Sequence, residues 1–200
     1  MKEFSLNNLV RENIKSLSPY SSARDEFKDG SPELIFIDAN ENPFDTGLNR
    51  YPDPQQHEVK EELSKLKGVS TAQILLGNGS DEVLDLIFRV FCEPKKDAVL
   101  VLPPTYGMYK VLANTNDIDL INSPLAADFQ PNVDEILKVQ NQPTKLLLLC
   151  SPNNPTANSF DTTKVERLLR GFKGIVVIDE AYVDFSEQES WVSGLKEFPN

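Results

Sequence analysis

The chain has 200 residues, of which 40% are hydrophobic and 26% charged, an ordinary composition for a globular protein with a buried core. Its 20 Lys and Arg against 31 Asp and Glu give a formal net charge of −11. This charge argues against a general nucleic-acid-binding protein, since such proteins present a basic face. The two cysteines, Cys92 and Cys150, lie in apolar runs and predict packing thiols of a reducing compartment. The apolar runs are too short to span a bilayer, so we expect a cytoplasmic protein with no membrane partner.

The first third of the chain predicts little regular structure. Residues Phe4–Leu17 have apolar side chains at helical spacing and predict an N-terminal arm or short helix. Residues 31–56 are rich in Pro, Asn and Asp and predict mostly an ordered loop, which follows a short strand at Leu34–Ile37 within this range. A polar amphipathic helix follows at His57–Lys67, and Gly68 ends it.

From Ile74 onward, short apolar runs alternate with helical segments. This rhythm predicts an α/β fold, a mostly parallel sheet with helices on both faces, although the order of the strands is not readable from it. The predicted strands are Ile74–Leu76, Ala98–Leu102, Ile118–Ile121, Leu146–Cys150 and Ile175–Ile178, and the predicted helices are Ser80–Phe91, Met108–Asn114, Val133–Gln140 and Thr162–Arg170.

Polar sequence of unusual composition follows four of these predicted strands. GNGSDE comes after Leu76, PPTYGMY after Leu102, SPNNPT after Cys150 and DEAY after Ile178. Ligands of open parallel sheets bind at the carboxyl ends of the strands. We therefore expect the four segments to meet in one binding site.

Two of the segments suit an anion and a flat ring. Gly79 would let the backbone approach a ligand, and the free N–H groups at the start of the next helix favour a phosphate. The alternative is an ordinary helix cap formed by Ser80 or Asp81. Tyr106 would stack on a heteroaromatic ring, or would simply pack with its hydroxyl in water.

The other two segments offer a fixed amide and a buried carboxylate. Asn154 lies between two prolines that stiffen its loop, although turn-forming residues need no function in a loop. Asp179 follows a buried strand, where a carboxylate is costly without a partner. That partner would be a protonated ring nitrogen, a helix terminus or a basic residue, and a metal is disfavoured because no histidine accompanies Asp179.

These pieces, in this order, resemble the large domain of the fold-type I aminotransferases (class II), which use pyridoxal phosphate (PLP). The resemblance is strongest to the histidinol-phosphate aminotransferases and covers about Leu9 to Asn200. It depends on RENIKSLSPYSSARDEF, DANENPF, RYPDPQ, GNGSDEVLDLIFRVFCEP, PPTYGMY, SPNNPT and IDEAYVDF. It implies an N-terminal arm over residues 1–30 and an incomplete PLP-binding large domain over residues 31–200, with the C-terminal part and the small domain absent.

The resemblance assigns the cofactor's phosphate and ring face to named positions. The backbone of Gly79, Ser80 and Asp81 would hold the phosphate, and Tyr106 would stack on the pyridine ring. Tyr51 would reach the cofactor phosphate of the partner subunit, which implies a homodimer with shared sites.

The resemblance also assigns the polar atoms of the ring and the substrate. Asp179 would pair with the ring nitrogen, while Asn154 and Tyr182 would donate to the phenolic oxygen. Among these, Asp179 and Tyr182 would be the catalytic residues. Tyr20 and Asn40 would lie near the substrate.

Two departures from the family pattern are visible. Ala157 replaces the glycine of Asn-Pro-Thr-Gly, which would add strain of roughly 1–2 kcal/mol if that position has φ > 0. The Schiff-base lysine of the family falls beyond Asn200, so we expect the chain by itself to be inactive.

The resemblance implies transamination of L-histidinol phosphate with 2-oxoglutarate in histidine biosynthesis by the full-length protein. The same motifs would suit a transaminase for aromatic amino acids or a PLP decarboxylase of phosphorylated amino acids. A non-catalytic truncated fragment is the alternative from a different class.

Overall fold

The computed structural model describes residues 4–21, 35, 37, 39–140 and 143–200. The chain divides into two compact units. Met1–Lys15 together with Leu75–Asn200 form the first, which contains the sheet and which we call the sheet unit. Ser16–Ile74 form the second, which we call the 16–74 unit.

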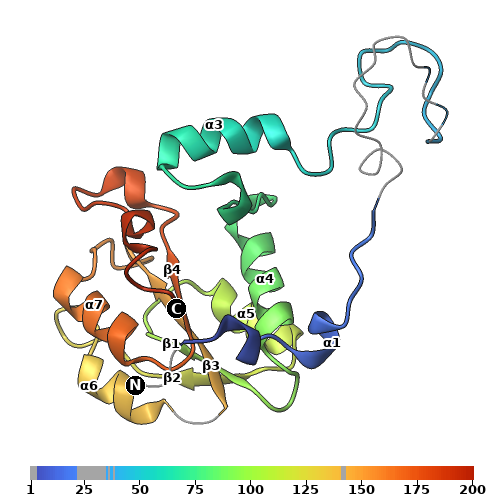
Figure 1. Ribbon diagram of the computed structural model, residues 1–200. Coiled ribbons are helices and arrows are strands. Elements are labelled where there is room, and N and C mark those ends of the chain that lie inside the picture. Colours follow the sequence, from blue (N-terminus) through green and yellow to red (C-terminus); the bar gives the residue numbers. More distant parts are fainter. Residues whose placement is uncertain (1–3, 22–34, 36, 38, 141–142) are drawn as a thin grey trace. The chain divides into compact units, whose positions relative to one another are not determined.

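Among the described residues, four parallel strands form the sheet, in the order β2-β1-β3-β4 (Figure 1). Their predominantly apolar sequences suit strands that are covered on both faces. The parallel α/β architecture predicted from the sequence is thereby confirmed, together with four of the six predicted strands. The strands are β1 (Ala98–Val101), β2 (Asp119–Asn122), β3 (Thr144–Cys150) and β4 (Ile175–Asp179).

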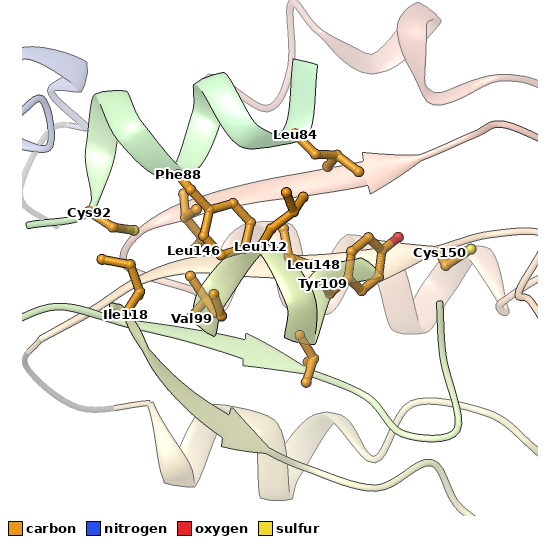
Figure 2. Packing of buried hydrophobic residues seen from close by; sticks show 12 residues of the cluster. Leu84, Phe88, Cys92, Val99, Tyr109, Leu112, Ile118, Leu146, Leu148 and Cys150 are labelled. Atoms are coloured by element: carbon orange, nitrogen blue, oxygen red, sulfur yellow. The ribbon is translucent and has the colours of Figure 1, made fainter. Parts of the chain in front are cut away.

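Helices cover both faces of this sheet, and alternate residues of β1 and β3 face opposite layers. Val99 and Leu146 pack with α4 and α5, as Figure 2 shows, whereas Leu100 and Leu147 pack with α6 and α7. The four helices match the predicted ones to within one residue at each end. They are α4 (Gly79–Phe91), α5 (Met108–Thr115), α6 (Val133–Val139) and α7 (Thr162–Gly171).

Two predicted strands need separate comment. The prediction of a strand at Ile74–Leu76 is wrong: Ile74 has extended dihedral angles (φ −113°, ψ 122°), but no strand of the described sheet pairs with this segment. An extended segment is a strand only if it forms hydrogen bonds with a neighbouring strand. The spacing of apolar residues in the sequence does not show whether such a neighbour exists. The predicted strand at Leu34–Ile37 falls largely outside the described residues.

The described N-terminal residues of the sheet unit, 4–15, form a short arm. It contains a 3₁₀ turn (Leu6–Asn8) and the single-turn helix α1 (Glu12–Lys15). Arg11 attaches this arm to α4, because its Nε donates to Glu93 Oε2 at 3.0 Å and its Nη1 donates to the carbonyl of Arg89 at 2.8 Å.

The 16–74 unit contains the predicted helix α3 (His57–Lys67). Gly68 ends it in the left-handed region (φ 69°), where glycine carries no steric penalty. A 3₁₀ turn (Thr71–Gln73) follows, closed by reciprocal bonds between Ser70 and Gln73. Within the described ranges of the chain, no helix is both long and apolar enough to cross a membrane.

Candidate functional site

The carboxylate of Asp179 ends β4, and it is only 9% exposed. Both of its oxygens accept a hydrogen bond: Oδ1 from the Ala181 backbone N–H at 3.1 Å and Oδ2 from the Tyr109 hydroxyl at 2.8 Å. Neighbouring Cys150 is paired with Asp179 across β3 and β4. The alternative of a basic partner is not what the structure shows, because the two groups that donate to this carboxylate, a hydroxyl and a backbone N–H, are both neutral. Each oxygen has a second lone pair, so the carboxylate can still accept another donor.

Tyr109 is a site residue that sequence reasoning missed. It lies in the first turn of α5 and is 1% exposed, with its hydroxyl directed toward the Cys150 end of β3 (Figure 2). Burial raises the pKa of Tyr109, and the charge of Asp179 raises it further. The hydroxyl therefore stays protonated and acts as a donor. The available signal was a tyrosine at a core position, since a buried hydroxyl needs a partner.

Tyr106 lies where the sequence placed it, just beyond β1, and it is half-buried. Its hydroxyl lies 3.2 Å from Asp81 Oδ1, to which it donates. Its ring meets the ring of Tyr109 edge to face, with centroids 5.6 Å apart and an interplanar angle of 88°. Burial, and then the charge of Asp81, raise the pKa of Tyr106, so this hydroxyl also remains a donor. Both ends of the ring are thus held in place.

The N-terminus of α4 lies in the GNGSDE segment, where the sequence predicts an anion site. The N-cap position is Asn78, whose side chain makes no capping bond, so the alternative of a cap by Ser80 or Asp81 is wrong. Glu82 instead accepts the Asn78 N–H at 2.5 Å. Gly79 has φ +75°, a conformation that favours glycine, and it starts the first helical turn, whose N–H groups have no intrahelical acceptor.

The SPNNPT loop is joined to the PPTYGMY loop by Asn153, another residue that sequence reasoning missed. Asn153 is 2% exposed, and its Nδ2 donates to the carbonyl of Pro104 at 2.9 Å. Its Oδ1 accepts from the Thr105 hydroxyl at 3.1 Å. The side chain of Asn154 is half-buried and bonds no residue of the described chain, so its amide is available to a ligand.

Ala157 has φ +60°, which confirms the positive φ considered for the position where the family has glycine. Its N–H donates to the carbonyl of Asn153 at 2.8 Å, closing the turn that requires this conformation. A single non-glycine residue in the left-handed region costs roughly 1–2 kcal/mol. The turn therefore carries local strain.

Beyond β4, Glu180 and Tyr182 of the DEAY segment have different surroundings. Glu180 accepts from the Ser190 hydroxyl at 2.5 Å and from the Trp191 N–H at 2.8 Å, which fixes the segment after the sheet. Tyr182 is 44% exposed and precedes the 3₁₀ turn Val183–Phe185.

Contacts therefore connect three of the four predicted segments through one series of side chains. Asp81 bonds Tyr106, Tyr106 contacts Tyr109, and Tyr109 bonds Asp179. Asn153 adds the SPNNPT loop to the same edge of the sheet. The described residues contain no group of three or more His, Cys, Asp or Glu side chains that could hold a metal ion.

The predicted residues Tyr20, Asn40 and Tyr51 belong to the 16–74 unit, and their roles stay predictions. Tyr20 is 93% exposed and Tyr51 62% exposed. The Tyr51 N–H donates to Glu41 Oε1 at 2.8 Å, and Arg50 Nη1 donates to Glu41 Oε2 at 2.6 Å. Glu41 thus ties the RYPDPQ segment to the segment that contains Asn40.

A family model described as aminotransferase class I and II matches residues 26–200. The chain belongs to this family. It is 60% identical over 200 residues to the histidinol-phosphate aminotransferase of Christiangramia forsetii, covering 100% of the chain and 57% of the relative. It is 51% identical over 195 residues to that of Bacteroides fragilis, covering 98% of the chain and 56% of the relative. The chain thus spans a little more than half the length of these curated relatives.

Solved structures of the family have the same fold. The histidinol-phosphate aminotransferase from Clostridium acetobutylicum superposes with a TM-score of 0.67 at 22% identity, covering 76% of this chain and 45% of that one. The enzyme of that name from Sinorhizobium meliloti, solved in complex with pyridoxal-5'-phosphate, gives a TM-score of 0.61 at 26% identity, covering 68% and 38%. The fold-type I architecture expected from the sequence is confirmed.

Proposed function

We propose that the full-length protein containing this chain is a PLP-dependent aminotransferase that acts on L-histidinol phosphate and 2-oxoglutarate in histidine biosynthesis. The 60% identity along all 200 residues with a curated histidinol-phosphate aminotransferase is the observation that carries this proposal. The connected site of Asp81, Tyr106, Tyr109 and Asp179 supports it, because it offers partners of the right chemistry for the cofactor.

The residues of the sheet unit fit the parts of pyridoxal phosphate. The first-turn N–H groups of Gly79, Ser80 and Asp81 would bind its phosphate, since a helix N-terminus favours an anion. The side chain of Asp81 is engaged by Tyr106, so the backbone of this residue is the part that would face the phosphate. The half-buried ring of Tyr106 would cover one face of the pyridine ring and exclude water from it.

The polar side chains would hold protons and orient the ring. Pyridoxal phosphate, when bound, supplies an electron sink and carries the amino group between substrates. Asp179 lies at the end of β4, and its carboxylate is buried. Because this negative charge would lie beside the ring nitrogen, it would keep the proton on that nitrogen. Asn154 and Tyr182 would donate to the phenolic oxygen and fix the orientation of the ring in its plane.

The remaining machinery would come from outside these residues. We propose that the lysine of the family, and the small domain, lie in the part of the relatives that this chain does not span. The lysine would act as the proton-transferring base. A homodimer would bring Tyr51 to the cofactor phosphate of the other subunit. The many exposed apolar side chains of the 16–74 unit suit such an interface, among them Leu17, Ile35, Ile37, Phe44, Leu48 and Leu66.

The test is formation of glutamate by the full-length protein from L-histidinol phosphate and 2-oxoglutarate in the presence of pyridoxal phosphate. We expect turnover with histidinol phosphate to exceed turnover with phenylalanine or tyrosine, and no turnover by residues 1–200 alone. Preference for an aromatic amino acid, or release of carbon dioxide from a phosphorylated amino acid, would instead indicate one of the alternative activities.

A single substitution tests the role of Asp179 within this function. Asp179→Ala should abolish turnover while the cofactor remains bound through its phosphate and ring face. Unchanged activity of this variant would remove the proposed role of Asp179.

A further inference from the structure

We propose that Tyr109 is a positioning residue of the cofactor site, which fixes the carboxylate of Asp179 through its hydroxyl and supports Tyr106 through its ring. This inference rests on the proposed function, since it assumes that Asp179 faces the ring nitrogen of the cofactor. Tyr109 itself is a residue of α5 and is buried in the core cluster that α4 and α5 form with the sheet (Figure 2).

The hydroxyl of Tyr109 restricts Asp179 on the side opposite to the backbone. Its donation to Oδ2 at 2.8 Å and the donation from Ala181 to Oδ1 at 3.1 Å define the plane of the carboxylate. A carboxylate held by two donors in this way is oriented before a ligand arrives. The remaining lone pairs are then the ones available to a ring N–H group.

The ring of Tyr109 supports the stacking residue. The edge-to-face contact with Tyr106, at 5.6 Å and 88°, fixes one side of the Tyr106 ring, and the bond to Asp81 fixes its hydroxyl end. Tyr109 therefore touches the two side chains that would bind the ring face and the ring nitrogen, and it connects them through one rigid group.

A role for residue 109 in core packing alone would not require a tyrosine. The cluster around Tyr109 is otherwise apolar and is built from residues such as Phe88, Leu112 and Leu148. Phenylalanine would fill the same volume there without the cost of burying a hydroxyl. The bond to a carboxylate at the end of β4 is what the hydroxyl adds.

The experiment separates the contribution of the Tyr109 hydroxyl from that of the Tyr109 ring. It also separates the contribution of the cofactor's ring nitrogen from that of the rest of the cofactor. Two ligands are compared in the full-length protein: pyridoxamine 5′-phosphate, which needs no lysine bond, and its 1-deaza analogue, in which CH replaces the ring nitrogen. Dissociation constants are measured by equilibrium dialysis for the unmodified protein, Tyr109→Phe and Tyr109→Leu. Ser123→Ala is the matched control, because it also removes a buried hydroxyl, one that bonds no partner among the described residues.

We expect Tyr109→Phe to weaken binding of pyridoxamine 5′-phosphate by about tenfold and binding of the deaza analogue by less than about twofold, since only the first ligand uses Asp179 as an acceptor. Tyr109→Leu also removes the support of Tyr106 and should weaken binding of both ligands. Ser123→Ala should change neither constant.

Two outcomes overturn the inference, and they are distinguishable. Equal effects of Tyr109→Phe on the two ligands, or no effect, would show that Tyr109 does not act through Asp179, and the proposed function would stand. Failure of the unmodified protein to bind either ligand would overturn the proposed function and this inference together.

A measurement on the unmodified protein makes the test independent of how the variants fold. With tyrosines labelled with ¹³C at Cζ, pyridoxamine 5′-phosphate should shift the Tyr109 resonance more than the deaza analogue does. Equal shifts with both ligands would contradict the inference.

Discussion

Replacing Ala157 by glycine should stabilise the protein. Ala157 has φ +60°, which costs an alanine roughly 1–2 kcal/mol relative to glycine. Glycine also increases the conformational entropy of the unfolded chain, which lowers the stability of the folded protein by about 0.4–1 kcal/mol. The methyl group of Ala157 is exposed, so its removal loses little buried surface. The difference between these two ranges is about 0–1.6 kcal/mol, and its central value of about 0.8 kcal/mol corresponds to a rise in Tm of about 2–3 °C for a chain of this size.

Thermal unfolding followed by circular dichroism measures this change, with Ala113→Gly as the control. Ala113 lies in the right-handed helix α5 and is fully buried, so the same substitution there should destabilise the protein by about 1 kcal/mol or more. Opposite signs for the two variants would follow from their backbone conformations. A fall in Tm for Ala157→Gly would refute the assignment of strain to this turn.

Three further predictions concern the core and the helices. Gly174→Ala should destabilise the protein by about 1–3 kcal/mol, as measured in urea, because the new Cβ would lie 2.2 Å from the carbonyl oxygen of Lys145; wild-type stability would contradict this packing. Asp161→Ala should lower the free energy of unfolding by about 1 kcal/mol through loss of the α7 N-cap, and Asp161→Asn should recover most of it. Burial, and then the charge of Asp97, raise the pKa of Cys92 to about 12, so iodoacetamide at neutral pH should modify Cys92 only after unfolding; labelling of the native protein, detected by mass spectrometry, would argue against this burial.

The elements of the sheet unit could be predicted because each is defined by a local period. The apolar positions of Ser80–Phe91 recur at helical spacing, and α4 begins one residue earlier, at Gly79. The order β2-β1-β3-β4 could not be predicted, because it depends on which strand edges meet after the helices have packed. The Ile74–Leu76 segment shows the same limit, since an extended run without a ladder partner is not a strand.

The residues of the candidate site likewise fall into those that could be predicted from the sequence and those that could not. Tyr106 and Asp179 could be predicted from the sequence because each follows a buried strand, and parallel strands bring their carboxyl ends to one edge. Tyr109 and Asn153 could not, because their roles depend on the partner across the fold. Asn153 stands beside Asn154 in the same loop, and only the bonds to Pro104 and Thr105 distinguish the structural asparagine from the available one.

The two tyrosines of PPTYGMY also differ in whether their roles could be predicted from the sequence. The spacing between them explains how both contribute to one candidate site. Tyr106 lies two residues before α5 and Tyr109 is the second residue of the helix, and the Tyr109 N–H donates to the carbonyl of Tyr106 at 3.4 Å, so a turn brings the two side chains together. The ring of Tyr109 can then contact the ring of Tyr106 while the Tyr109 hydroxyl donates to Asp179, which lies 70 residues later in the chain. Moving the second tyrosine by one position would turn its hydroxyl away from β4. A Tyr109→Phe, Lys110→Tyr double variant should therefore fail to recover the binding of pyridoxamine 5′-phosphate lost in Tyr109→Phe, and recovery would show that a tyrosine in this turn suffices wherever it stands.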